Sequence, residues 1–445
     1  MRKGKALFAC AAFAGAAIGA TAAPEISDVT LTPNNAGMVT ITYKLTGEDA
    51  VVTPDVLTNG VSIGDANIRG FVGDINKLIA ASNVTRTIYW CPRTFWPNQL
   101  IEENKLQVKL TAWPKANPPD YMAQSIYTPD IRYFYPSAEA VPGGVTNRAY
   151  KTNLLLMRRI HAAGVEWTSG APENDPTYVA PDSANATILA HAVTLTNDYY
   201  IGVYETTVAQ VKFGAYQDSS NARINYGMYM SQFTNETLFA QPDAFVRPFD
   251  SMSWCRLRMD TTDSRNSYHW PECGHAVHPS SPGALFRKAT GLELDLPTEA
   301  QWEFAARAGV CGYYAGDCDE IAWHKGNWRN DPMRVQYGNA NNSHEVGLLK
   351  PNGFGLFDML GNLCEWCLDP LPDKYNATLT DPYKGAATIE PVGAYGAPAD
   401  VNHVLCGGDC GEASDILSCS RRKSAAYGAY NAARGFRLVC PATLP

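Results

Sequence analysis

The hydrophobic pattern changes along the chain, and this change limits the folds open to it. Between about residue 24 and residue 135, apolar and polar residues alternate in several short runs. Alternation of period two is typical of strands that bury one face, because successive side chains on a strand point to opposite sides. The two clearest runs place on one face Val39, Ile41, Tyr43 and Leu45, and then Leu106, Val108, Leu110 and Ala112. This first part is therefore expected to be an all-β domain.

The pattern over residues 24–135 resembles a small antiparallel β-sandwich of the fibronectin type III or immunoglobulin kind. Turn-forming clusters such as TPNNAG separate its runs. Cys91 stands alone in this region, and we expect a buried thiol there. Residues 136–147 have the Pro, Gly and Ser content of a linker. Because 445 residues exceed one ordinary core, a second domain is expected over residues 148–442.

Residues 1–22 have the pattern of a secretory signal peptide. Arg2, Lys3 and Lys5 precede a short apolar stretch, and small residues allow cleavage after Ala22. We expect an exported protein (periplasmic, secreted or at the cell surface) without a stable membrane span after cleavage; an uncleaved anchor is the alternative. The net charge of −8, with no basic run beyond the first five residues, argues against a nucleic-acid partner.

The second part of the chain has few long periodic segments, but two helix starts stand out. Thr207 and Gln210 have the spacing of a capping box. The segment LPTEAQWEFAARAG repeats this signal with Thr298 and Gln301, and Gly309 can end the helix in a left-handed conformation. Trp, Asn and Gly are frequent around these helices, which indicates a fold rich in irregular structure.

The chain has twelve cysteines, of which Cys10 lies in the signal segment. Export would permit disulfides, and Cys311 and Cys318 are the favoured local pair. Cys364 and Cys367 form a C-x-x-C, for which packing or disulfide roles are favoured over redox catalysis, because no βαβ context is present. A weak zinc hypothesis rests on one cluster of soft ligands: His269, Cys273, His275 and His278.

Four strings along residues 150–442 resemble the formylglycine-generating enzyme, or sulfatase-modifying factor, family. They are HAVTLTNDYYIGVYETTVAQ, then RPFDSMSW with DLPTEAQWEFAARAG, then KPNGFGLFDMLGNLCEWCLD, and finally VLCGGDC with RGFRLV. The resemblance implies a mixed α+β, C-type-lectin-like fold with little regular structure.

The same resemblance implies a calcium site in the third string. Its ligands would be the side chains of Asp358 and Glu365 with the backbone carbonyls of Gly361 and Leu363. Hard oxygen ligands of this mixture suit Ca²⁺, which would pin a long loop. The alternative is that the two carboxylates cap turns and pair with nearby arginines.

Active members of the family oxidise a cysteine of a client sulfatase to formylglycine with O₂ and copper held by two cysteines. Two soft thiolates are the ligands that Cu(I) prefers. Here Cys410 follows the Gly407–Gly408–Asp409 turn directly and eight residues separate it from Cys419, so neither matches the expected pair. We expect a disulfide between Cys410 and Cys419; the alternatives are unpaired thiols, other pairings with Cys406 or Cys440, and a shifted copper site.

The sequence therefore favours an exported, non-catalytic, calcium-stabilised module that binds a protein or glycan. The alternative is a copper-dependent oxidase with a client sulfatase as its partner, in which Cys410 and Cys419 would be catalytic. Four arginines near the end, Arg421, Arg422, Arg434 and Arg437, are expected to pair with acidic side chains of the loops.

Overall fold

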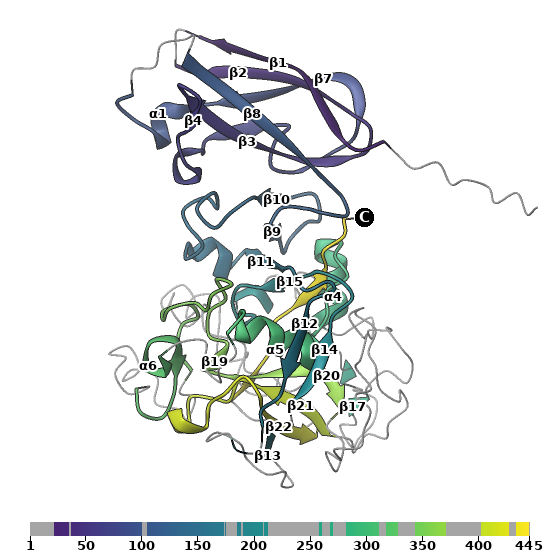
Figure 1. Cartoon of the computed structure of the whole chain (residues 1–445), viewed down its shortest axis with the longest axis vertical. Helices are drawn as coiled ribbons and strands as arrows, with labels where there is room; N and C mark the ends of the chain where they lie inside the picture. The colour runs from purple at the N-terminus through teal and green to yellow at the C-terminus, as the bar shows by residue number, and fades with distance from the viewer. Residues whose placement is uncertain are drawn as a thin grey trace, which may run out of the picture.

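The computed structural model places the chain as a mixed, sheet-rich fold with few helices (Figure 1). It describes residues 22–34, 37–99, 105–172, 174, 185–187, 190–207, 209–211, 258–259, 268–269, 282–310, 317–327, 343–370, 402–426 and 433–444. The predicted signal segment, except Ala22, lies outside these residues. So do Cys311 and the predicted zinc ligands, except the backbone of His269.

The first part of the chain forms two antiparallel sheets. The first sheet has the order β1-β2-β7-β5, and in the second β3 lies between β4 and β6 and also pairs with β8. The strands are β1 (Glu25–Pro33), β2 (Val39–Thr46), β3 (Ala50–Thr58), β4 (Val61–Ser62), β5 (Phe71–Gly73), β6 (Leu78–Ile79), β7 (Ser82–Trp90) and β8 (Leu106–Pro114). Two short helices accompany them, η1 (Asp65–Asn67) and α1 (Pro92–Phe95).

The alternation read from the sequence corresponds to burial in β2 and β8. The apolar face of β2 is buried, from Val39 to Leu45. The apolar face of β8 is half-buried and packs against the same cluster of side chains. The prediction for Cys91 is wrong, because this residue is exposed. It directly precedes α1, outside the strand pairing that would have turned it inward.

The second part is built around two five-stranded sheets. Their orders are β10-β9-β11-β15-β24 and β13-β22-β21-β20-β23. The first contains β9 (Tyr121–Ser125), β10 (Arg132–Tyr135), β11 (Leu154–Ile160), β15 (Tyr199–Gly202) and β24 (Val439–Pro441). The second contains β13 (Asn185–Thr187), β20 (Cys364–Pro370), β21 (Asn402–Cys406), β22 (Arg421–Ala426) and β23 (Arg434–Gly435).

Short strand pairs and helices complete this part. The pairs are β12 (Glu166–Ser169) with β14 (His191–Thr194), β16 (Arg258–Met259) with β17 (Tyr268–His269), and β18 (Ala322–Trp323) with β19 (Leu360–Gly361). The helices are η3 (Arg148–Lys151), α4 (Pro282–Thr290), α5 (Glu299–Arg307), α6 (Cys318–Ile321) and η9 (Ser414–Ile416). Among the residues that the structure describes, no helix combines the length and apolar character that a membrane crossing needs.

The change from one part to the other occurs earlier than the sequence suggested. Strands β9 and β10 fall within the predicted first domain, yet they pair with β11 in the sheet of the second part. The predicted linker, residues 136–147, is turn-rich but packed, with Ala140 and Val141 buried in one cluster with Tyr150. Alternation marks a strand without saying which sheet it joins, which is why the boundary was misplaced.

Both predicted capping boxes are present. Thr298 accepts a hydrogen bond from the backbone N–H of Gln301, whose side chain bonds back to Thr298 at the start of α5. Thr207 and Gln210 make the same reciprocal pair. At the end of α5, Ala308 itself adopts the left-handed conformation with φ 49°, and Gly309 follows with φ 81°. The helix therefore ends one residue earlier than Gly309 predicted.

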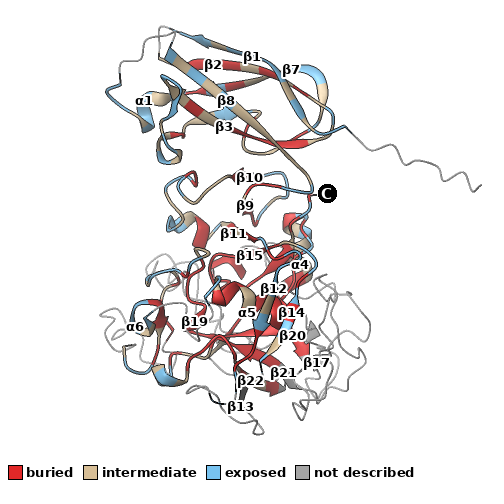
Figure 2. Ribbon diagram, viewed as in Figure 1, coloured by how far each residue is buried: buried red, intermediate tan, exposed pale blue. Residues whose placement is uncertain are grey.

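Burial is concentrated in the second part (Figure 2), where two hydrophobic clusters flank the β20–β21 region. One contains Cys364 and Trp366; the other contains Cys367, Cys406 and the buried face of α5. Residues one apart on β20 point to opposite faces, so this strand contributes to both clusters. The end of β21 and the segment before β20 therefore pack against buried side chains on both faces.

Candidate functional site

The turn after β21 packs on the segment that leads into β20. Gly407 and Gly408 have φ values of 87° and 71°, and a Cβ at Gly407 would lie 2.8 Å from the Met359 carbonyl oxygen. The Gly361 N–H donates to the Gly407 carbonyl at 3.0 Å. The Cys410 N–H donates to the Asn362 carbonyl at 3.1 Å. The third and fourth strings of the family resemblance therefore meet in space at a turn that requires glycine.

Glu365 and Arg437 form a buried ion pair beneath this turn. Arg437 Nη2 lies 2.6 Å from Glu365 Oε1, and Nε lies 2.7 Å from Oε2. Trp302 Nε1 of α5 donates to Oε2 at 2.7 Å. Arg437 also donates to the carbonyls of Gly202 and Phe357, so its guanidinium joins strand ends that are far apart in the sequence. The expected pairing of Arg437 is confirmed.

A second buried carboxylate, Glu205, lies in the same place. Its Oε2 accepts from Asn362 Nδ2 at 2.6 Å and its Oε1 from the Leu363 N–H at 3.1 Å. Sequence analysis did not select Glu205, although it lies within the first matched string. A glutamate two residues before the capping box, at the end of a largely apolar run, is the signal that could have found it.

Asp358 completes the cluster and is incompletely paired. Its Oδ2 accepts from the Gly347 N–H at 2.6 Å, whereas its buried Oδ1 has no hydrogen-bond partner. Burial raises the pKa of Asp358 to about 6. Burial and the neighbouring Asp358 and Glu365 carboxylates raise the pKa of Glu205 well above its usual range. Arg437 is ion-paired with Glu365 and lies near Glu205 and Asp358, so the cluster holds more carboxyl groups than guanidinium groups.

The structure brings the predicted calcium ligands together in part. Asp358 and Glu365 lie in one buried cluster, and Gly361 and Leu363 lie between them in the chain. However, Glu365 is paired with Arg437, as the alternative interpretation expected, and the Leu363 N–H is bound to Glu205. Within the described ranges, no three His, Cys, Asp or Glu side chains are grouped as a metal site.

Cys410 and Cys419 are not brought together. Both are free thiols, so the expected disulfide between them is not formed. Cys410 is buried beside Asp409, Glu205 and Lys423, whereas Cys419 is buried beside Glu303, Arg307 and Arg422. Burial raises the pKa of each thiol to about 12. The Gly-rich turn directs Cys410 toward the 358–365 segment, while Cys419 enters the core beside α5.

Asp409, the residue after the two glycines, forms an ion pair. Lys423 Nζ lies 2.6 Å from Asp409 Oδ2 and 3.1 Å from Glu412 Oε2. The Asp409 N–H also donates to Glu412 Oε2 at 3.2 Å. Charged side chains of the protein therefore pair with one another beside this turn.

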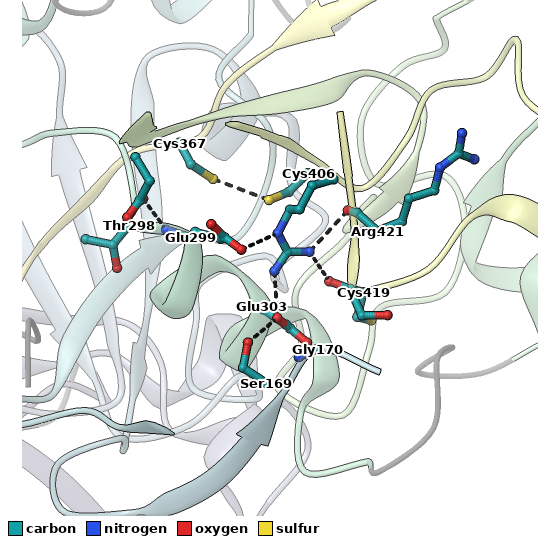
Figure 3. Close-up of polar contacts among 12 residues, drawn as sticks. Ser169, Gly170, Thr298, Glu299, Glu303, Cys367, Cys406, Cys419 and Arg421 are labelled. Atoms are coloured by element: carbon teal, nitrogen blue, oxygen red, sulfur yellow. Dashed lines mark hydrogen bonds and ion pairs between the residues drawn. The ribbon is translucent and has the colours of Figure 1, made fainter. Parts of the chain in front are cut away.

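The C-x-x-C motif lies on β20, and its cysteines have different neighbours. Cys364 packs in one hydrophobic cluster and Cys367 in the other, because residues three apart on a strand point to opposite faces. Cys367 instead lies against Cys406 of β21, with 3.5 Å between their Sγ atoms (Figure 3). Sequence reasoning did not identify this pair, since the two residues are far apart in the chain.

Arg422 links α5 to β22 in the interior. Its Nε lies 2.7 Å from Glu299 Oε1, and its Nη2 lies 2.6 Å from Glu303 Oε2. Burial raises the pKa of Glu303, but Arg422 and Arg307 outweigh this effect, so its pKa lies below the usual range. The expected pairing of Arg422 is confirmed, and the network is structural.

Comparison with known proteins agrees with this arrangement. Residues 163–442 match the model of the "Sulfatase-modifying factor enzyme 1-like domain" family. A formylglycine-generating enzyme of Streptomyces coelicolor is 27% identical over 58% of this chain and 84% of its own length. A "Serine/threonine-protein kinase pkn1" of Chlamydia pneumoniae is 33% identical over 41% of this chain, and the match spans 27% of the relative's own length.

Among solved structures, PvdO from Pseudomonas aeruginosa covers 64% of this chain and 94% of its own, with 20% identity and a TM-score of 0.39. The family match spans more than half of the chain and includes the turn, the buried cluster and both strings that form them. The chain therefore belongs to the sulfatase-modifying factor enzyme 1-like family.

Proposed function

We propose that this protein is a non-catalytic, calcium-stabilised member of its family that binds a protein or glycan ligand. The main support is the position of the two candidate copper ligands. Cys410 and Cys419 are buried, with exposures of 4% and 0%, and are surrounded by different sets of charged side chains. Copper oxidation chemistry on a client peptide needs two thiolates that converge where the peptide can reach them.

Copper does not fit the residues that follow the Gly407–Gly408 turn. The place beside Cys410 is taken by the Lys423, Asp409 and Glu412 ion cluster. No catalytic step is therefore assigned to either cysteine.

Calcium fits better, in the cluster around Asp358. The unpartnered Oδ1 of Asp358 and the excess of carboxylates over guanidinium favour a cation there. Asp358 and Glu365 would hold it with the carbonyls of Gly361 and Leu363, and Glu205 would add a further carboxylate nearby. The ion would supply positive charge and would fix the segment before β20 against the turn after β21.

The proposal includes the setting of the module. The basic and apolar pattern of residues 1–22 supports export. The family match supports a C-type-lectin-like form of the fold, which would bind its ligand at surface loops rather than in a deep core. The first part, as a fibronectin- or immunoglobulin-like sandwich, would act as a spacer or as a second contact surface.

The functional test compares this protein with an active formylglycine-generating enzyme. Both are incubated with a cysteine-containing sulfatase peptide, Cu(I) and O₂, and the peptide aldehyde is measured by mass spectrometry. We expect turnover by the active enzyme alone. Aldehyde formation by this protein, abolished by Cys410→Ala or Cys419→Ala, would establish the oxidase, which the name of the Streptomyces relative supports, and would refute the non-catalytic function.

The calcium test measures thermal unfolding with Ca²⁺ and with a chelator. At a Ca²⁺ concentration 100 times the Kd, binding stabilises the fold by about 2.7 kcal/mol. We expect Asp358→Ala to abolish the Ca²⁺-dependent rise in Tm. Asp369→Ala is the matched control, since it removes another buried carboxylate from the same region without touching the cluster. An equal Ca²⁺ response in both variants would contradict the assignment.

A further inference from the structure

Two thiols from adjacent strands meet in the core behind the candidate site. Cys367 of β20 and Cys406 at the end of β21 have their Sγ atoms 3.5 Å apart, and the Cys367 thiol donates to Cys406 (Figure 3). Both side chains have an exposure of 0%. The residue after Cys406 is Gly407, so the pair lies directly at the base of the glycine turn.

The strand pairing explains why these two side chains share a face. Strands β20 and β21 are antiparallel, and Glu365 is paired with Cys406. Cys367 lies two residues beyond Glu365 and therefore points to the same side of the sheet. The two cysteines are diagonal neighbours, and the pairing becomes irregular just beyond Trp366. This local geometry lets two side chains approach that a sequence reading would not connect.

We propose that Cys367 and Cys406 form a disulfide that staples β20 to β21. The Sγ atoms must close from 3.5 Å to about 2.0 Å for the bond to form. In the reaction, the two thiols lose two protons and two electrons and form one S–S bond. The oxidant is a disulfide, of a thiol oxidoreductase or of glutathione, which is reduced to two thiols through a mixed disulfide.

The bond must form while the chain is folding. In the native core neither sulfur is accessible to an exchange partner, because both side chains have an exposure of 0%. An oxidant therefore reaches the pair before the core closes. Once closed, the bond is protected from reductants in the same way, so it is structural rather than a reversible switch.

The position gives the disulfide a consequence for the site. The bond would join the strand that carries Glu365 to the strand that leads into the Gly407–Gly408 turn. Cys367 and Cys406 are 39 positions apart in the chain, so the bond would also close a long loop and restrict the unfolded state. A bond of this kind typically lowers the unfolding equilibrium constant by about 30- to 1,000-fold.

A third thiol, that of Cys419, is an alternative partner for Cys406. Cys419 lies in the same hydrophobic cluster, and its pKa is raised first by burial and in part by Cys406. The hydrogen-bonded contact of 3.5 Å is to Cys367, however, and this distance decides the assignment. A Cys406–Cys419 bond would therefore overturn the proposal.

The direct experiment is peptide mapping without reduction. The full chain is folded with reduced and oxidised glutathione, denatured in acid, alkylated and digested, and the fragments are identified by mass spectrometry. We expect a cross-linked peptide pair that contains Cys367 and Cys406 and lacks two hydrogens. Alkylation of both residues, or a bond from either one to Cys419, would refute the disulfide.

A second experiment uses stability and does not depend on mapping. Dithiothreitol in the unfolding buffer should raise the unfolding equilibrium constant of the wild type about 30-fold or more. Most of this effect should vanish in Cys367→Ala/Cys406→Ala and persist in Cys440→Ala, which removes another buried thiol, on β24 of the other five-stranded sheet. The same dithiothreitol effect in all three proteins contradicts the proposal. If the double variant does not fold, the mapping of the wild type decides alone.

Discussion

Arg422 is held in the interior by two carboxylates of one helix. It is 0% exposed and bonds to Glu299 and Glu303 of α5, while its Nη1 donates to the Cys419 carbonyl at 2.7 Å. A buried charge is tolerated only where its partners meet it with matched geometry. The pairing therefore fixes β22 to α5, and the loss of one partner leaves the others buried and uncompensated.

We expect Arg422→Met to lower the free energy of unfolding by about 3–5 kcal/mol, because it leaves two buried glutamates short of a partner. Arg421→Met is the control: its partner Glu412 lies 3.3 Å away and also pairs with Lys423. The control should lose clearly less stability. Urea unfolding measures both, and equal losses would show that the buried network has no special role.

Asp369 gives stability a dependence on pH. Burial and the nearby Glu299 raise the pKa of its carboxyl to about 8. Between pH 4 and pH 8 the folded protein keeps a proton that the unfolded chain has released. The free energy of unfolding should therefore fall as pH rises through this window, by about 1.4 kcal/mol per pH unit from this group.

Asp369→Asn tests this sign. The amide oxygen can still accept the Glu299 N–H, which lies 2.6 Å from Asp369 Oδ2, but it has no proton to lose. The pH dependence of the variant, measured by urea unfolding from pH 5 to pH 8, should be flatter than that of the wild type. A parallel pair of curves would exclude Asp369 as the source.

At the scale of elements, α5 shows how closely local sequence can specify a helix start. The capping box of Thr298 and Gln301 could be predicted from the sequence, because it depends only on residues three apart. We expect Thr298→Ala to cost about 1 kcal/mol of stability, since one N-terminal N–H loses its acceptor. Thr298→Ser keeps the acceptor and should stay within a few tenths of a kcal/mol. Chemical denaturation distinguishes the two, and equal behaviour would contradict a capping role.

Strand β20, in contrast, has a side-chain contact that the local sequence does not reveal. The sequence presents Cys364 and Cys367 as one motif, whereas the strand sends them into different clusters. The meaningful neighbour of Cys367 is Cys406, which only the β20–β21 pairing brings within 3.5 Å. A pattern along the chain cannot reveal such a contact, because cross-strand pairing is set by tertiary packing.

At the scale of the whole molecule, β3 connects the two parts of the chain. Ala50 and Val52 pack in the core of the first part, while Val51 points the other way and joins a cluster of the second part. The Phe134 N–H of β10 also donates to the Asn76 carbonyl at 2.7 Å. The two parts therefore share apolar and polar contacts.

We expect Val51→Asp to destabilise the protein by at least about 3 kcal/mol, because it buries an unpaired charge where the two parts meet. Val61→Asp is the control on the neighbouring strand β4, where the side chain is 69% exposed, and should stay within about 0.5 kcal/mol. Differential scanning fluorimetry compares the two. A mild effect of Val51→Asp would mean that the parts are held together elsewhere.

The sequence by itself determined what depends on near neighbours: the alternating faces of β2 and β8, the two capping boxes, and the family to which residues 163–442 belong. The tertiary structure alone decided which sheet β9 and β10 join, that Glu205 enters the buried acidic cluster, and that Cys410 and Cys419 are separated. The physical reason is the distance along the chain over which each interaction acts. Periodicity and capping act over a few residues, whereas burial, charge balance and thiol contacts arise between segments that meet only when the core closes.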